Sequence, residues 1–276
     1  MLKRTLSGAV LIVVMIGLMY AGGWVLLTGL LAMSLIGLYE FYHALENGGH
    51  CPFRILGAVA AFVYYAVILL RPEYVQEGNF FLLYAAVFFM VIMVISVLRY
   101  PHRRIEDGAL TVTGFIYVPV LFSFLYFLRQ QTDGVFYVWF VFLASWGSDT
   151  CAYLAGRAFG RHKLVAQLSP KKTVEGAIGG VAGSVLLSLL YAVCIHSYVG
   201  LNAGSLYLMS ILVGLFGSVL GQVGDLFASS VKRVMEIKDY GKLIPGHGGI
   251  LDRFDSTLLV GPAVMIVIYI AMQLGI

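Results

Sequence analysis

Nine long apolar segments fill most of this 276-residue chain and leave short polar connections between them. A bilayer core about 30 Å thick needs roughly 20 apolar residues per helix, and a spanning helix satisfies its own backbone polar groups. The segments are residues 7–22, 24–42, 55–70, 79–98, 109–128, 134–155, 174–195, 205–228 and 257–274. At 60% hydrophobic and 12% charged residues, the composition is not that of a soluble domain. We therefore expect an all-α, polytopic integral membrane protein with about nine transmembrane helices.

Lys and Arg are distributed unevenly between the two sides that nine spans would define. All of the 18 basic residues except Arg71 and Arg129 fall on the side of the N-terminus. Basic residues in short loops are retained in the cytoplasm. The N-terminus and the two longest connections, residues 156–173 and 229–256, are therefore predicted to be cytoplasmic. Eight or ten spans would move at least one basic cluster to the other side.

The polar residues of the chain are concentrated in its C-terminal half. We expect one membrane domain, residues 1–276, without a separate soluble domain. Within it, residues 1–130 carry few polar groups inside their spans and are interpreted as a scaffold that faces lipid. Residues 131–276 are predicted to carry the functional site.

One connection is unusually rich in charge. Residues 229–255 contain nine charged side chains, and Asp252 and Asp255 share one face of a helix that we expect to begin near Leu251. Asp225, near the end of the preceding span, can present a third carboxylate at the same depth. Oxygen ligands without His or Cys companions favour Mg²⁺ over zinc. The composition therefore indicates a site for a metal-bound polyphosphate at the membrane surface.

Glycines separate these carboxylates. In the run 245–249, Gly246, Gly248 and Gly249 allow close approach of the backbone to a ligand. His247, between two of them, either takes part in proton transfer or phosphate binding, or caps a turn.

Two further features precede this connection. Asp149 lies inside the sixth span, where a carboxylate is costly and indicates a function, unless it pairs with an Arg of a neighbouring helix. Ser169 followed by Pro170 predicts a helix start. Lys171 and Lys172 would then lie beside the positive end of the helix dipole, where they either bind an anion or only follow the positive-inside rule.

The segment 230–255, called the signature segment below, resembles the motif of the phosphatidate cytidylyltransferases, also called CDP-diacylglycerol synthases. Its matching residues are Ser230, Lys232, Arg233, Lys238, Asp239, Gly241, Ile244, the run 245–249, Ile250, Asp252, Arg253, Phe254 and Asp255. The resemblance extends to residues 148–164 and 169–176, whereas the N-terminal half is similar only in hydropathy.

The resemblance implies transfer of a cytidylyl group from CTP to phosphatidate, forming CDP-diacylglycerol and pyrophosphate. It also implies dependence on Mg²⁺, with a second cation left open, and a homodimer with a polar cavity open to the cytoplasm. We expect the protein in a bacterial inner membrane, among membrane lipids, without a nucleic-acid partner.

The resemblance also implies residue roles. Asp225 and Asp252 are the main metal ligands, with Asp149 and Asp255 as additional ligands or supports. The cations bind the triphosphate or the lipid phosphate. The catalytic set is Asp225, Asp252, Lys232, Arg233, Lys238, Asp239, His247 and Arg253, and the substrate-binding set is Ser169, Lys171, Lys172, Ser230, Gly246, Gly248 and Gly249.

Two alternatives remain open at this point. A CTP-dependent lipid kinase of the polyprenol or phytol type would transfer the γ-phosphoryl group to an alcohol and release CDP. A transporter would use intramembrane carboxylates to bind ions, but its pathway should continue toward the far leaflet. The charged residues of this chain cluster on one side only.

Overall fold

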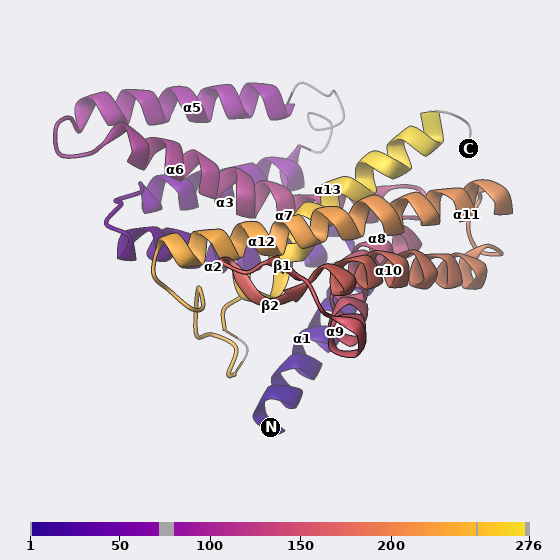
Figure 1. The fold of residues 1–276 in the computed structure, drawn as a ribbon. Helices are drawn as coiled ribbons and strands as arrows, with labels where there is room; N and C mark the ends of the chain where they lie inside the picture. Colours follow the sequence, from indigo (N-terminus) through magenta and orange to yellow (C-terminus); the bar gives the residue numbers. More distant parts are fainter. Residues whose placement is uncertain (1, 72–79, 247, 274–276) are drawn as a thin grey trace. The chain divides into compact units, whose positions relative to one another are not determined.

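The computed structural model describes residues 2–71, 80–246 and 248–273, and most of them are helical (Figure 1). The chain forms two compact units. The first comprises Met1–Ser123 and Val234–Asp252, and the second comprises Phe124–Arg233 and Arg253–Ile276. The prediction of one membrane domain with a scaffold in residues 1–130 stays a prediction.

The first unit is built from the N-terminal helices. They are α1 (Leu2–Ala21), α2 (Gly23–Asn47), α3 (Arg54–Leu70), α5 (Phe80–Leu98), α6 (Ile105–Phe115), the π-helical turn η1 (Ile116–Val120) and the first residues of α7 (Leu121–Gln130). Pro119 lies in η1 and lacks the N–H that an α-helix needs, which accounts for the wider turn. Aromatic side chains fill the interior, and the hydroxyls of Tyr42, Tyr64 and Tyr65 form hydrogen bonds, as in the 2.7 Å bond from Tyr42 to the Thr111 carbonyl.

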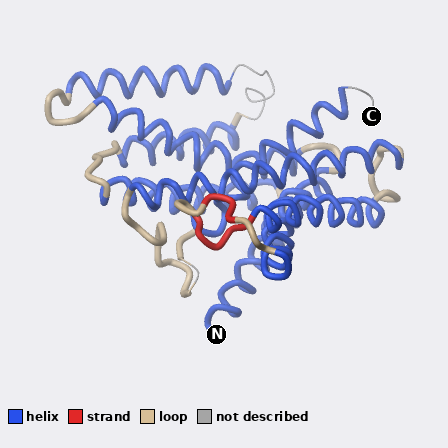
Figure 2. The backbone as a smooth tube through the Cα atoms, viewed as in Figure 1, coloured by secondary structure: helices blue, strands red, loops and turns tan. Residues whose placement is uncertain are grey.

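The second unit holds the remaining helices and a short hairpin. It contains the rest of α7, α8 (Gly134–Phe142), η2 (Leu143–Gly147), α9 (Ser148–Phe159), β1 (Lys163–Val165), β2 (Ser169–Thr173), α10 (Val174–Ile195), α11 (Ala203–Leu212), η3 (Val213–Gly217), α12 (Ser218–Val234) and all but the first two residues of α13 (Leu251–Gln273). Helices α9 and α10 pack closely because Gly179 and Gly183 face Ala155 and Cys151. The antiparallel strands β1 and β2 are the red segments in Figure 2.

Two π-helical turns precede the functional helices of this unit. η2 leads into α9, which carries Asp149, and η3 leads into α12, which carries Asp225. A π-helical turn accommodates an extra residue and changes which side chains share a face of the helix, and such turns are frequent at functional sites. The rotation that they impose could not be read from the apolar pattern.

The predicted membrane architecture is confirmed in class but not in number. Among the described residues, seven helices are long and apolar enough to cross a membrane, and they begin at Gly23, Phe80, Ile105, Gly134, Val174, Ala203 and Leu251. Two shorter apolar helices, Ser7–Ala21 and Arg54–Leu70, coincide with the first and third predicted spans. Nine spans therefore stays a prediction, and its limits at residues 79 and 274 lie outside the described residues.

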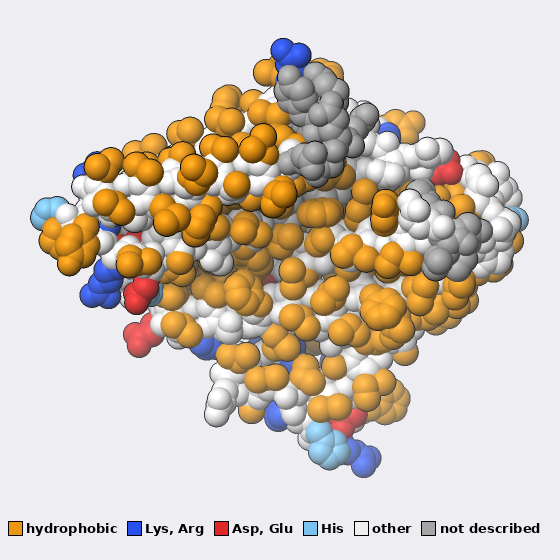
Figure 3. Space-filling model, turned by 90° about the horizontal axis from the view of Figure 1, so that it is seen from above, with side chains coloured by type: hydrophobic (Ala, Val, Ile, Leu, Met, Phe, Trp, Pro, Cys, Tyr) orange, Lys and Arg blue, Asp and Glu red, His pale blue; other side chains and the backbone are white. Residues whose placement is uncertain are grey.

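Large hydrophobic side chains are exposed along these helices. Ile55 and Ile105, for example, are 82% and 84% exposed, and hydrophobic side chains cover most of the face shown in Figure 3. A soluble monomer rarely exposes so much contiguous apolar surface. The chain is therefore an integral membrane protein.

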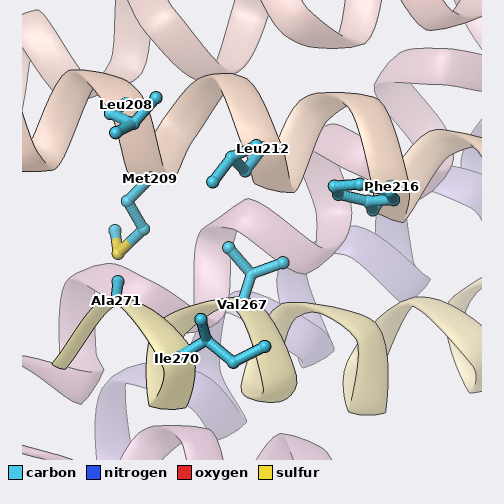
Figure 4. Close-up of a pocket in the computed structure, with 7 residues that line it drawn as sticks. All are labelled: Leu208, Met209, Leu212, Phe216, Val267, Ile270 and Ala271. Atoms are coloured by element: carbon cyan, nitrogen blue, oxygen red, sulfur yellow. The ribbon is translucent and has the colours of Figure 1, made fainter. Parts of the chain in front are cut away.

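The second unit also contains an apolar cavity of about 160 Å³ between α11–η3 and α13. Leu208, Leu212 and Phe216 line one side of it, opposite Val267 and Ile270 (Figure 4). Its lining is hydrophobic, so it does not suit a triphosphate.

Candidate active site

Three of the predicted metal ligands come together within the second unit. Asp149 is in the first turn of α9, Asp225 is in α12, and Asp255 is in the second turn of α13. Asp225 interacts electrostatically with both of the other carboxylates, and Asp149 and Asp255 interact with each other. We call these three residues the acidic cluster. Their mutual repulsion makes the cluster a natural place for a cation.

Hydroxyl and amide groups orient the acidic cluster. The Ser256 hydroxyl donates to Asp149 Oδ2 at 3.4 Å, and the Ser256 amide donates to Asp255 Oδ1 at 2.8 Å. The Ser229 hydroxyl donates to Asp225 Oδ1 at 3.4 Å. Ser229 and Ser256 were not among the predicted site residues, although Ser229 precedes the predicted Ser230 and Ser256 follows the predicted Asp255.

Lys172 supplies a positive charge to this cluster. Its Nζ lies 2.5 Å from Asp225 Oδ2, and the two side chains are 25% and 26% exposed. Lys172 also interacts electrostatically with Asp149. Of the two lysines that were predicted as substrate-binding, Lys172 therefore lies at the carboxylates, while the side chain of Lys171 is exposed.

The predicted helix start at Ser169 and Pro170 is wrong. Residues Ser169–Thr173 form strand β2, which pairs with β1, and α10 begins only at Val174. The hydroxyl of Thr173, not that of Ser169, accepts the bond from the Gly176 amide that caps the helix. Residues 169–173 form a strand rather than a helical turn because they find backbone partners in β1. The helix begins later because Thr173 offers a capping hydroxyl closer to the apolar run.

Glu175 binds the residues that precede the β1–β2 hairpin, whose second strand carries Lys171 and Lys172. Its carboxylate accepts bonds from the Arg161 and His162 amides at 3.0 and 3.2 Å, and it pairs with His162 Nδ1 at 2.6 Å. These bonds tie the connection between α9 and β1 to the start of α10. Neither Glu175 nor His162 was predicted as a functional residue, and their spacing in the sequence gave no sign of the pair.

The predicted cations Lys232, Arg233 and Arg253 lie on helices rather than in a loop. Lys232 and Arg233 occupy the last turn of α12, which continues six residues beyond the predicted end of its span at residue 228. Lys232 interacts electrostatically with Asp255, and Arg253 interacts with Asp149. Arg233 donates to the Leu168 carbonyl at 3.3 Å, and the Ser230 hydroxyl donates to the Phe227 carbonyl of its own helix at 2.7 Å. Two of the predicted cations thus neighbour the acidic cluster.

The remaining part of the signature segment belongs to the first unit, and α13 begins at the predicted Leu251. The loop before this helix, residues 240–250, is called the glycine loop. Asp252 Oδ2 accepts bonds from the Tyr240 amide at 2.8 Å and the Gly249 amide at 3.0 Å. Gly248 has a φ of +85°, and the Ile244 amide donates to its carbonyl at 2.8 Å. Asp252 therefore orders the loop that precedes it.

Other predicted residues of the first unit are at its surface. Lys238, Asp239 and Gly246 are exposed, so they are accessible to a ligand. The predicted His247 lies outside the described residues. Their assignment to the catalytic or substrate-binding set therefore stays a prediction.

The carboxylate oxygens suit a hard divalent cation. Among the described residues, no group of three or more His, Cys, Asp and Glu side chains is placed so that it could hold a metal ion. Mg²⁺ needs fewer protein ligands than that, because it takes one or two carboxylates and completes its octahedron with water and substrate phosphates. The residues present therefore fit a cation that arrives with a polyphosphate.

The chain has relatives with described activities. Residues 2–271 match the model of the cytidylyltransferase family. A phosphatidate cytidylyltransferase of Staphylococcus epidermidis is 34% identical over 268 residues, which cover 96% of this chain and 98% of the relative. The proteins of the same name from Staphylococcus aureus and Staphylococcus saprophyticus are 34% and 32% identical, with the same coverage. The similarity thus includes the N-terminal half, where only hydropathy had indicated it.

Proposed function

The chain belongs to the cytidylyltransferase family, and we propose that it transfers a cytidylyl group from CTP to phosphatidate. In this reaction a phosphate oxygen of phosphatidate attacks the α-phosphorus of CTP. The bond between the α-phosphorus and the bridging oxygen breaks, and pyrophosphate leaves. The products are CDP-diacylglycerol and pyrophosphate.

The acidic cluster, together with Lys172, is the observation that carries this proposal. Asp149, Asp225 and Asp255 lie in helices long and apolar enough to span a membrane, where carboxylates are retained for function. Asp252 is one helical turn before Asp255 on α13. We assign Asp225 and Asp252 as the main ligands of Mg²⁺, with Asp149 and Asp255 as further ligands or supports. The bound cation would neutralise charge on the phosphates.

The protein side chains have three tasks in this reaction. Lipid phosphate is already anionic near neutral pH, so the attacking group needs no strong general base. The site must instead bring two polyanions together, align them and balance their charge. Lys171, Lys172, Lys232, Arg233, Lys238 and Arg253 are assigned to the phosphates, and His247 has a secondary role.

The distribution of Lys and Arg supports a location of the site on the cytoplasmic side of the membrane. CTP is a cytoplasmic substrate, and phosphatidate presents its phosphate at the headgroup level. The excess of Lys and Arg in alternate connections supports a cytoplasmic N-terminus and a site open to the cytoplasm. We also propose a homodimer in the bacterial plasma membrane, on the basis of the family resemblance.

Labelled CTP tests the reaction against its alternative. The purified protein is incubated in detergent with Mg²⁺ and phosphatidate, and with CTP that is labelled either at the α- or at the γ-phosphate. Cytidylyl transfer puts the α-label in the lipid and the γ-label in pyrophosphate. A lipid kinase would instead release the α-label as CDP and transfer the γ-label to a lipid alcohol. If a second incubation with a polyprenol or phytol as acceptor gave that result, the proposal would be overturned.

A further inference from the structure

Glu40 is a buried carboxylate in a part of the chain that was predicted to be a scaffold. It lies in α2, a candidate membrane span, and is only 4% exposed. A carboxylate in such a place is costly unless it has a specific partner. Its partners therefore indicate what it does.

Both oxygens of Glu40 bind the beginning of α13. The Ile250 amide donates to Oε1 at 3.1 Å, and the Leu251 amide donates to Oε2 at 2.9 Å. The first N–H groups of a helix have no partner within the helix, and they carry the positive end of its dipole. Bonds from these groups to a carboxylate are charge-assisted and strong. Glu40, about 210 residues away in sequence, thus caps the N-terminus of α13.

The glycine loop is shaped to fit this carboxylate. A Cβ atom at Gly249 or at Gly241 would overlap the Glu40 carboxylate. The loop backbone can therefore approach Glu40 only because both positions lack a side chain. Next to Glu40, the Phe41 ring stacks on the buried Tyr240 ring, with centroids 6.4 Å apart. Two neighbouring residues of α2 hold the loop.

The same backbone positions Asp252. Asp252 Oδ2 accepts from the Tyr240 and Gly249 amides, and Asp252 follows Leu251, whose amide binds Glu40. The orientation of the Asp252 carboxylate is therefore set by a loop that Glu40 and Phe41 hold. Mutation of groups that orient a metal ligand in this way typically lowers metal affinity or activity about 10- to 100-fold.

We propose that Glu40 is a positioning residue for cytidylyl transfer. Its carboxylate fixes the N-terminus of α13 and the glycine loop, and through them it orients Asp252. The inference rests on the proposed function, because Asp252 is assigned there as a main metal ligand. It gives the N-terminal half of the chain a role in the reaction beyond that of a scaffold.

The test compares Glu40→Gln with Glu40→Asp and with a matched control, Glu46→Gln. Glutamine offers one oxygen and turns an N–H group toward a backbone N–H, so one bond is lost. We expect Glu40→Gln to lower kcat/KM for CTP about 10- to 100-fold and to raise the Mg²⁺ concentration for half-maximal activity. Glu40→Asp keeps both oxygens and should recover part of the loss. Glu46, on the same helix, pairs with Arg54 away from the glycine loop and is about one-third exposed, so its variant should behave as wild type.

Hydrogen exchange gives a second readout. In folded Glu40→Gln, the amides of residues 250 and 251 should exchange faster, while those of α5 should be unchanged. If Glu40→Gln does not fold, Glu40→Asp and Gly249→Ala provide the same readouts, because the alanine side chain displaces the carboxylate from the loop. Unchanged Mg²⁺ dependence and unchanged exchange in the folded variants would overturn the proposal, even if total activity fell.

Failure of this proposal is distinguishable from failure of the proposed function. If the wild-type protein formed no CDP-diacylglycerol, the function would be wrong, and exchange at residues 250 and 251 would still report whether Glu40 holds α13. If the wild type were active and the folded Glu40 variants matched it in kcat/KM and Mg²⁺ dependence, only the positioning role would be wrong.

Discussion

Replacement of Lys172 by methionine removes the positive charge beside the acidic cluster and keeps most of the side-chain volume. Lys172 Nζ lies 2.5 Å from Asp225 Oδ2, and each side chain is about one-quarter exposed. Breaking an ion pair costs about 0.2–1 kcal/mol when the pair is exposed and about 3–5 kcal/mol when it is buried. Partial exposure puts this pair between the two, at about 2 kcal/mol. If the pair acts in the transition state, its loss lowers kcat/KM about 30-fold.

The physical reason for the loss is repulsion. Without Lys172, the acidic cluster faces the triphosphate with one positive charge fewer, so CTP binding and charge neutralisation both weaken. The assay is incorporation of α-labelled CTP into lipid by purified protein in detergent, with kcat and KM measured at saturating Mg²⁺. Lys172→Arg keeps the charge but not the compact ammonium, so it should fall between wild type and Lys172→Met.

A charge-matched control separates this effect from net charge. Lys242 is exposed in the glycine loop, and Lys242→Met makes the same change in total charge. It should stay within about twofold of wild type, as expected for an exposed charge. Equal losses in the two variants, or full activity in folded Lys172→Met, would refute the reasoning.

Two further predictions concern the loops around the site. Gly248→Ala should destabilise the protein by at least about 1–2 kcal/mol, because alanine is strained at a φ of +85°. It should also lower turnover, because its Cβ would lie 2.6 Å from an Asp252 oxygen. Thermal unfolding in detergent and turnover measure the two effects, and an unfolding temperature equal to that of wild type would contradict the prediction. Glu175→Gln should weaken the bonds to the Arg161 and His162 amides and lower turnover by up to about fivefold, the scale of exposed pairs. Hydrogen exchange at residues 161 and 162 should then be faster, and slower or equal exchange would show that Glu175 does not hold the hairpin.

The membrane class of the fold could be predicted because hydropathy alone determines it. Long apolar runs must become helices in a bilayer, and the predicted segment 174–195 coincides with α10. The ends of helices were less predictable. The amphipathic last turns of α12 extend to Val234, beyond the apolar run, so Lys232 and Arg233 were expected in a loop but lie on a helix.

The acidic cluster could be predicted in part. Asp149 was found because a carboxylate is unusual inside an apolar span. Asp255 was found by its helical spacing from Asp252 in the charged connection, and Asp225 by its place at the end of the preceding span. The pair of Lys172 with Asp225 could not be read from the sequence, because it depends on how strand β2 of the hairpin presents Lys172. The N-cap of α10 was misplaced, at Ser169 instead of Thr173, because both residues are capable caps and tertiary pairing decided between them.

Glu40 was overlooked although the sequence contained a usable signal. The rule that marked Asp149, an acidic residue inside an apolar span, applies equally to Glu40 within the predicted segment 24–42. Its partners are backbone amides in the signature segment, and no local pattern connects two positions so far apart. The rule can identify such a residue, but only the structure identifies what it holds.

Asp225→Asn tests the central claim most directly. The variant keeps the size of the side chain but removes the charge that joins Lys172 to the other two carboxylates. The measurement is the rate of CDP-diacylglycerol formation from α-labelled CTP and phosphatidate, titrated with Mg²⁺ and compared with wild type at equal folded protein. We predict a loss of at least about 100-fold, the scale on which removal of a group that stabilises transition-state charge lowers kcat. Near-normal turnover with an unchanged Mg²⁺ requirement would contradict the assignment of the acidic cluster as the catalytic site.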